Sequence, residues 1–318
     1  PNIEDYIDYE IAHYSSQKET EGLTYWVECL SGVPLHLDLE ILTVSQKPID
    51  PKDIATYFSL EDDLSKALRA TARKLGSTSF VLISAVFAML LAHYAGQQKF
   101  VLTFPINMRP KGFKKLLGSF INTSFLVIDA DPHMSLSQFV TSLTAQRNRS
   151  KSHQDIAFVD VLEELLRNDS SESHQLFNIT ITPGAHLGSL PLLLDGCDVK
   201  GVPVNVHYDG EINLAYQFDN GFDFRLDDHK RFFNNGKDSC FSRDFIAVLQ
   251  QFMSNPDALI QDITMGEEDT KLTSYAAENI SVDFGSDDEL LHRRFEWWAD
   301  SHPEDNVIIN NGICYSYR

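Results

Sequence analysis

The most constraining feature of this sequence is a continuous apolar segment over residues 79–95, SFVLISAVFAMLLAHYA. It has almost no polar face, which is typical of a helix that is buried on all sides. It is shorter than the roughly 20 apolar residues of a membrane-spanning helix, so it predicts an internal helix of a folded domain that Gly96 ends. Such a helix needs a large core around it, and 43% hydrophobic residues can supply one.

Helix and strand patterns alternate around this segment. Helical spacing of apolar residues predicts helices over 23–30, 62–75, 136–147, 241–253 and 290–299. Strands are expected over 57–60, 100–105, 123–129 and 177–182, with Pro105 as a strand stop. Hairpins are expected between 204–208 and 212–218, around Asp209-Gly210, and between 307–309 and 313–315, around Asn311-Gly312.

Charge and cysteine spacing narrow the classes of function. A formal net charge of −20 argues against nucleic acid as a partner, because that binding needs Lys and Arg to neutralise phosphates. The four cysteines, at positions 29, 197, 240 and 314, have no metal-binding spacing, so we expect reduced thiols and no metal site. A secretory signal and a membrane-length segment are both missing from the sequence, so no membrane partner and a cytoplasmic location are the expectation.

Short motifs follow one another along residues 1–165. They are Asp5-Tyr6-Ile7-Asp8-Tyr9, Tyr25-Trp26 with Leu30-Ser31-Gly32, Gly76 with Thr78 and Phe80, Gly96-Gln97 with Pro105 and Arg109, Leu117-Gly118-Ser119-Phe120-Ile121-Asn122-Thr123, and His153-Gln154-Asp155-Ile156-Ala157-Phe158. In this order they resemble the signatures of the condensation domain of nonribosomal peptide synthetases. The most specific is residues 118–123, which is similar to the family's G-x-F-[VI]-N-T. Two departures are Ala157, where the family usually has proline, and a degenerate seventh segment over 167–177.

The resemblance implies an α/β fold like that of chloramphenicol acetyltransferase, a two-layer sandwich. This chain would be the C-terminal subdomain of a V-shaped domain, with a tunnel between its two subdomains. The implied activity is that of an acyltransferase, in which the amine of a downstream aminoacyl thioester attacks an upstream acyl or peptidyl thioester and forms an amide. Both substrates would hang on the 4'-phosphopantetheine arms of upstream and downstream peptidyl carrier domains, so no cofactor is bound directly.

The same resemblance divides the chain. Residues 1–265 are expected to be the C-terminal portion of a condensation domain, and the polar stretch 266–289 a linker. Residues 290–318 resemble the beginning of an adenylation domain, on the basis of Leu291-His292, Phe295, Pro303 and Tyr317. The implied partners are therefore the N-terminal condensation subdomain, the adenylation domain and the carrier domains.

The family's catalytic motif, H-H-x-x-x-D-G, has no match in this sequence. In His207-Tyr208-Asp209-Gly210 the spacing is wrong, and the Asp-Gly pair is expected to be a turn. The family places the motif upstream of D-Y-x-x-W, so we expect it before Pro1 and expect the 318 residues alone to be inactive. An alternative is a non-catalytic docking or scaffold module of the same synthetase, which the absence of an upstream motif would favour. A free-standing acyltransferase is a weaker alternative, because the end of the chain resembles an adenylation domain.

The candidates for lining the substrate and pantetheine tunnel are Arg109, Gly118, Asn122, Thr123, His153, Gln154 and Asp155. Each has a structural alternative. Asn122 and Thr123 either hydrogen-bond an arm or satisfy backbone groups at a turn. Residues 153–155 either belong to the tunnel or complement a helix C-terminus, with Asp155 as the N-cap of a helix over 157–166. Arg109 is expected to be a tunnel residue or a buried ion-pair partner near the subdomain junction.

Overall fold

The computed structural model describes residues 2–13, 16–39, 55–168, 176–184, 211–228, 232–233, 240–265, 301, 306–310 and 313–316. The chain divides into two compact units, Pro1–Glu267 and Glu268–Arg318. The helices of the first unit are α1 (Ile3–His13), α2 (Ser16–Leu30), α3 (Asp62–Lys74), α4 (Ser79–Ala95), η3 (Lys111–Phe113), α5 (Leu136–Ser150), η4 (Lys151–His153), α6 (Phe158–Asn168), α7 (Cys240–Ser254) and η5 (Ile260–Asp262). Its strands are β1 (Ala55–Ser59), β2 (Lys99–Asn107), β3 (Ile121–Asp129), β4 (Ile179–Pro183), β5 (Ile212–Phe218) and β6 (Phe222–Asp228).

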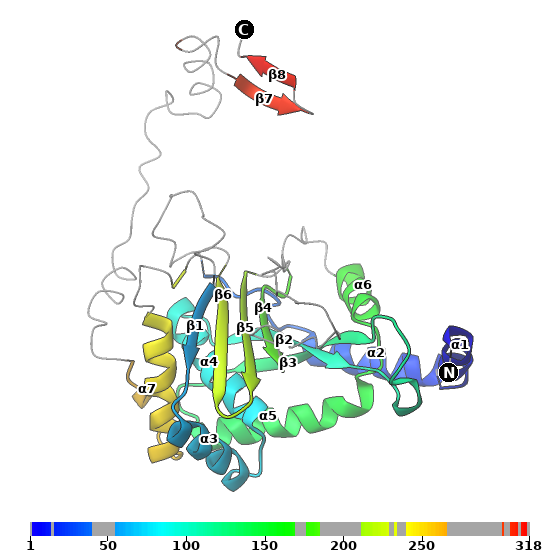
Figure 1. The fold of residues 1–318 in the computed structure, drawn as a ribbon. Coiled ribbons are helices and arrows are strands. Elements are labelled where there is room, and N and C mark those ends of the chain that lie inside the picture. The colour runs from blue at the N-terminus through cyan, green and yellow to red at the C-terminus, as the bar shows by residue number, and fades with distance from the viewer. Residues whose placement is uncertain are drawn as a thin grey trace, which may run out of the picture. The chain divides into compact units, whose positions relative to one another are not determined.

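The strands of the first unit form one mixed sheet in the order β1-β6-β5-β4-β2-β3 (Figure 1). The pairs β1–β6, β5–β6 and β2–β3 are antiparallel, and β4 pairs in parallel with both β2 and β5. Helices expected over 23–30, 62–75, 136–147 and 241–253 are confirmed as α2, α3, α5 and α7. The expected α/β class is confirmed, because helices pack on this sheet.

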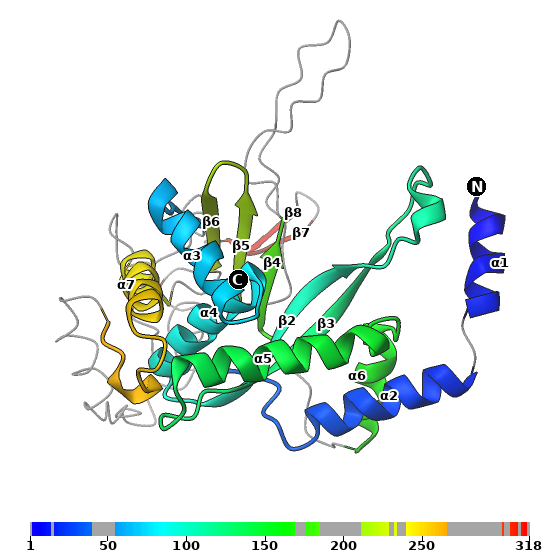
Figure 2. The ribbon, with the colours of Figure 1, turned by 90° about the horizontal axis from the view of Figure 1, so that it is seen from below.

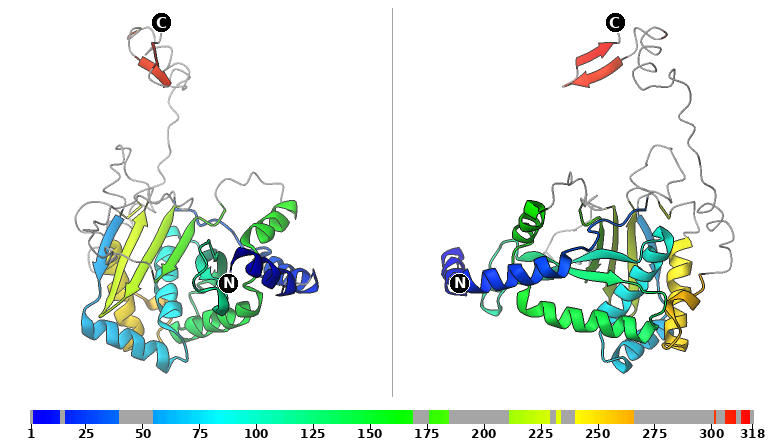
Figure 3. Two further views of the ribbon diagram at one scale, coloured as in Figure 1. Left: turned by 45° about the vertical axis from the view of Figure 1, so that its right-hand side comes forward. Right: turned by 180° about the vertical axis from the view of Figure 1, so that it is seen from behind.

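One face of the sheet carries most of the helices (Figure 3). The ring centroids of Phe80 in α4 and Phe104 in β2 lie 5.0 Å apart, and those of Phe224 in β6 and Phe245 in α7 lie 5.2 Å apart. Alternate strand residues point to opposite faces, and the pairing registers place Phe104 and Phe224 on the same one. Helices α4 and α7 therefore share a face.

The opposite face is covered by α2 and α6 at the end of the sheet formed by β2 and β3. Phe125 of β3 contacts Trp26 of α2 and Phe158 of α6, with ring centroids 5.0 and 5.6 Å apart respectively. Phe125 lies opposite Thr103 in the pairing register, so the two residues share this face. The rest of this face, over β4, β5 and β6, carries polar side chains.

Helix α4 is the buried centre that its sequence predicts. The Thr78 side chain accepts a hydrogen bond from the N–H of Val81 and caps the start of the helix, and Gly96 ends it in the left-handed conformation with φ 64°. Residues 81–92 are all buried. Within the described chain, no single helix is long and apolar enough to cross a membrane; α3 and α4 pass that test only as a pair bent by 102°.

The expectation that Pro105 ends its strand is wrong. Strand β2 runs on to Asn107, and Pro105 lies opposite Thr123 of β3. On the other side, β4 pairs with β2 only at Thr103. Beyond Thr103 this edge of β2 carries no described partner strand, and an edge position tolerates a residue that has no N–H.

The prediction of a hairpin around Asp209-Gly210 is wrong, because residues 212–218, its expected second strand, pair with other strands. Residues 204–210 lie outside the described residues, but both edges of β5 are occupied, by β4 in parallel and by β6. The hairpin partner of β5 is β6, across a turn in which the N–H of Asp219 donates to the carbonyl of Gly221. The predicted linker over 266–289 and the predicted helix over 290–299 also lie outside the residues that the structure describes.

The second unit contains β7 (Asn306–Asn310) and β8 (Ile313–Ser316), which pair antiparallel. The hairpin expected around Asn311-Gly312 is therefore confirmed.

Candidate functional site

Two of the sequence motifs meet where α2 packs against η4. The indole N–H of Trp26 donates to the carbonyl of His153 at 2.8 Å, and the ring of Tyr25 stacks on the imidazole of His153 with centroids 4.1 Å apart. Gly22, one turn earlier in α2, permits this approach, because a Cβ there would lie 2.5 Å from Cγ1 of Ile156. The Tyr25-Trp26 motif and the motif at 153–158 thus act as one packing unit.

Asn122 joins this unit to strand β3. Its amide nitrogen Nδ2 donates to the carbonyls of Gln154 at 3.0 Å and Ile156 at 2.6 Å. Its oxygen Oδ1 accepts from the N–H groups of Thr123 at 2.9 Å and Phe158 at 3.1 Å. Both donors and both acceptor positions of the amide are therefore used by backbone. Asn122 acts as a bracket between β3 and residues 154–158.

The start of α6 differs from the expected one. The helix begins at Phe158, so that Ala157 and not Asp155 occupies the N-cap position, and the N–H of Phe158 donates to Oδ1 of Asn122. The expected N-cap role of Asp155 for a helix over 157–166 is corrected accordingly. A long-range cap of this kind satisfies an N–H group that the first turn leaves without a helical partner.

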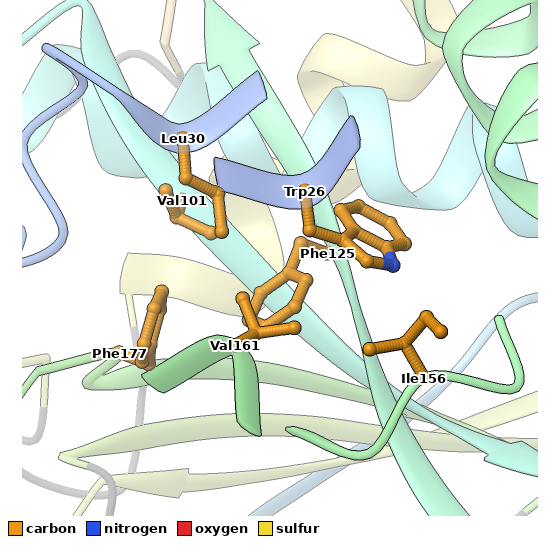
Figure 4. Packing of buried hydrophobic residues seen from close by; sticks show 7 residues of the cluster. All are labelled: Trp26, Leu30, Val101, Phe125, Ile156, Val161 and Phe177. Atoms are coloured by element: carbon orange, nitrogen blue, oxygen red, sulfur yellow. The ribbon is translucent and has the colours of Figure 1, made fainter. Parts of the chain in front are cut away.

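These motif residues converge on one hydrophobic cluster, shown in Figure 4. Its buried members are Trp26, Leu30, Val101, Phe125, Ile156, Val161 and Phe177. Phe177 joins it from the degenerate segment 167–177 with a positive φ of 60°. Its N–H donates to the carbonyl of Leu35, which ties residues 30–39 to the same cluster. Segments that are far apart in the sequence therefore share one core.

Burial changes the acidity of two groups at the edge of this cluster. It raises the pKa of Tyr25 to about 12, and the neighbouring Cys29 adds to this effect. Burial also raises the pKa of the Cys29 thiol. A thiol with a raised pKa is mostly protonated at neutral pH and is a poor nucleophile. Cys29 and Tyr25 are thus suited to packing rather than to covalent chemistry.

Arg109 organises the loop between β2 and β3. Its guanidinium donates to the carbonyls of Phe113 and Gly118 at 3.2 Å each, and also to that of Leu116. It stacks on the ring of Phe120, 3.9 Å from the centroid. These partners are carbonyl groups and a ring face, whereas an ion-pair partner was one of the two expectations for Arg109. Arg109 and Gly118 therefore meet in one loop, next to the strand that carries Asn122 and Thr123.

A second polar arrangement was not anticipated from the sequence. The hydroxyls of Thr103 and Thr180 lie 2.9 Å apart, Thr182 donates to Oδ1 of Asn213 at 2.8 Å, and Nδ2 of Asn213 donates to Asp227 at 3.1 Å. Arg225 pairs with Asp227 at 2.9 Å. These side chains lie on the part of the sheet face that α2 and α6 do not cover. The alternation of apolar and polar residues in β6, FDFRLDD, is the sequence signal that could have revealed them.

Of the remaining candidates, Thr123 faces Pro105 across the β2–β3 pair, and Gln154 contributes its carbonyl to Asn122. His207 and the Asp209-Gly210 pair lie outside the described residues. Among the described residues, no group of three or more His, Cys, Asp or Glu side chains could hold a metal ion.

Comparisons with known proteins show the family of the chain. The family described as "Condensation domain" matches residues 1–273, so the chain belongs to the condensation domain family. It is similar to tyrocidine synthase 3 of Brevibacillus parabrevis, with 23% identity over 327 residues that cover 100% of this chain and 5% of that protein. The chain therefore spans only a small part of the length of such relatives.

The fold is similar to that of two solved structures. Holo-AB3403, a four-domain nonribosomal peptide synthetase bound to AMP and glycine, gives a TM-score of 0.65 at 19% identity, over 99% of this chain and 25% of that one. The first condensation domain of the CDA synthetase gives 0.58 at 14% identity, over 81% of this chain and 55% of that one. The expected fold class, an α/β sandwich like that of chloramphenicol acetyltransferase, is confirmed.

Proposed function

We propose that this chain is part of a synthetase condensation domain that joins an upstream acyl or peptidyl thioester to a downstream aminoacyl thioester. The amine attacks the thioester carbonyl, the new C–N bond replaces the C–S bond, and the thiol of the upstream arm leaves with the proton that the amine loses. The observation that carries this proposal is the convergence of Trp26, Asn122 and residues 153–158 on one unit, in a chain whose first 273 residues match the family.

The substrates and partners belong to the same proposal. Both substrates would arrive on the 4'-phosphopantetheine arms of carrier domains, and holding two thioesters together supplies a large proximity contribution to the rate. Residues 290–318 would open the adenylation domain that follows the linker 266–289. The N-terminal condensation subdomain would provide the H-H-x-x-x-D-G histidines, which have no match in these 318 residues.

Contacts among the described residues support a positioning part for this chain in that reaction. The bracket of Asn122 holds residues 154–158 against β3, and Arg109 holds the β2–β3 loop in shape. We therefore assign Asn122 and Arg109 as positioning residues of the proposed tunnel. Gly118, Thr123, His153, Gln154 and Asp155 remain its candidate lining residues.

The test is an amide-formation assay that uses carrier domains loaded with donor and acceptor and that detects the product by mass spectrometry. We expect product with the intact condensation domain, and none above the no-protein control with the 318 residues alone. His207→Ala should leave the rate within a few-fold, because His207 lacks the family's spacing. An intact domain that forms no amide from the loaded carriers would overturn the proposal, and turnover by the 318 residues alone would refute the assignment of the histidines to the other subdomain.

A further inference from the structure

Strands β2 and β4 are parallel neighbours that separate toward their carboxyl ends. Their pairing register contains only Thr103 and Thr180, although β2 continues to Asn107 and β4 to Pro183. Figure 2 shows the β2–β3 pair running away from β4. Past the two threonines, no strand of the described chain pairs with the facing edges of β2 and β4. These edges are therefore suited to main-chain pairing with an extended ligand.

The chain leaves these two strands toward opposite sides of the sheet. Strand β2 is followed by β3 on one side, and the next described strand after β4 is β5 on the other side. Adjacent parallel strands whose continuations go to opposite sides form a topological switch point. In open α/β sheets, ligands bind beyond the carboxyl ends of the strands at such a point. The topology thus indicates a ligand site at the carboxyl ends of β2 and β4.

Threonine side chains gather on one face of the sheet at this point. The pairing registers, and the alternation of side chains along each strand, place on the same face Thr103, Thr123, Thr180 and Thr182. Thr103 is 4% exposed, and the other three are half-buried. Thr123 lies opposite Pro105, which follows Thr103 on that face of β2. These hydroxyls therefore flank the place where β2 and β4 separate.

The directions of the hydrogen bonds define what the hydroxyls of β4 can bind. Thr103 uses its one hydroxyl hydrogen on the carbonyl of Ile179 at 2.9 Å, so Thr180 is the donor in the 2.9 Å contact between Thr103 and Thr180. Thr182 donates to Oδ1 of Asn213 at 2.8 Å. The oxygens of Thr180 and Thr182 can still accept, but their hydrogens are already used. They suit a ligand that has N–H groups, and they have no hydrogen to donate to a phosphate.

Thr123 on β3 offers the opposite capacity. Its hydroxyl makes no hydrogen bond within the described chain, so it can donate to a carbonyl. Acceptors on β4, a donor on β3 and strand edges between them match a group that has both an N–H and a C=O. The secondary amide is such a group, and it pairs with a strand edge as a peptide does.

We propose that the carboxyl ends of β2 and β4 bind the amide-bearing part of a substrate. Thr180 and Thr182 accept from its N–H groups, and Thr123 donates to a carbonyl. This inference rests on the proposed function, which supplies such amides from either of two sources, the pantetheine arm or the peptidyl chain that it carries. It adds two residues of β4 to the candidate tunnel residue Thr123.

The experiment measures binding to the intact condensation domain by isothermal titration. One probe is pantetheine, which carries amides but no phosphate, and the other is acetyl-glycyl-glycinamide, a peptide without the arm. At least one probe should bind, and Thr180→Val should weaken its binding about fivefold, the net contribution of one hydrogen bond. Thr180→Ser keeps the hydroxyl and should restore the affinity. Thr141→Val, at an exposed residue of α5 whose hydroxyl donates to the carbonyl of Ser137, is the matched control and should leave the affinity unchanged.

Binding of pantetheine alone would assign the site to the arm, and binding of the peptide alone would assign it to the peptidyl chain. The inference would be overturned if neither probe bound, or if Thr180→Val left the binding unchanged. A loss that Thr180→Ser did not restore would also overturn it, because the hydroxyl would then not be the cause. Titration does not require turnover, so a domain that binds a probe through Thr180 but forms no amide would contradict the proposed function and leave this inference supported.

Discussion

Among single residues, Asn122 makes the most specific set of contacts, since its amide bonds two carbonyls and two N–H groups. Asn122→Ala should lower the free energy of unfolding by about 1–3 kcal/mol, because backbone groups lose their partners. Asn122→Asp should lose as much stability as Asn122→Ala at pH 7. Its stability relative to the unsubstituted protein should recover as the pH falls, because a protonated carboxyl can again donate to the carbonyl of Gln154 or Ile156. Urea unfolding at pH 7 and 4.5 measures both. Asn148→Ala, at an exposed residue of α5, should change the stability by less than about 0.5 kcal/mol. A stable Asn122→Ala variant would refute the bracket.

Between elements, the close contact of α2 with residues 153–156 depends on Gly22. Helix propensity alone predicts that Gly22→Ala stabilises α2 by about 1 kcal/mol. The new Cβ would however lie 2.5 Å from Ile156, so we expect a net loss of about 1–3 kcal/mol in the free energy of unfolding. The double variant Gly22→Ala, Ile156→Ala should lose less free energy of unfolding than the sum of the losses of the two single variants. A double-mutant cycle of urea unfolding measures this difference. Gly112→Ala, where a Cβ meets nothing within 4 Å, is the control. A stabilised Gly22→Ala protein would show that α2 does not pack so closely.

At the scale of the whole molecule, burial raises the pKa of Tyr25 to about 12 and also raises that of Tyr216, in a different part of the sheet. A phenol whose pKa is higher in the folded state stabilises the fold below its unfolded pKa of about 10, and this contribution is lost as the pH rises toward the folded value. We therefore expect the free energy of unfolding to fall between pH 10 and 12, and to fall less steeply in Tyr25→Phe. Urea unfolding across this range measures the slope. Tyr57→Phe, at a ring 63% exposed, should keep the wild-type slope, and identical slopes for all three proteins would contradict the prediction.

Features that depend on neighbouring residues could be predicted without the structure. The apolar segment 79–95 predicts a buried helix because a side chain's place around a helix depends only on local spacing, and Gly96 ends it because glycine adopts a positive φ readily. The hairpin around Asn311-Gly312 follows in the same way from a two-residue turn. The motif order also indicated the family, since it needs no knowledge of contacts.

Contacts between distant groups, in contrast, became known from the folded structure alone. The pairing of β5 with β4 and β6 overrode the local Asp-Gly signal, because a strand has just two edges and both were taken by other strands. The bracket of Asn122 reaches residues up to 36 positions away, and the bond from Trp26 to His153 spans 127. Hydrogen bonds between such distant residues depend on how the helices pack on the sheet, and no local pattern of residue types encodes that packing.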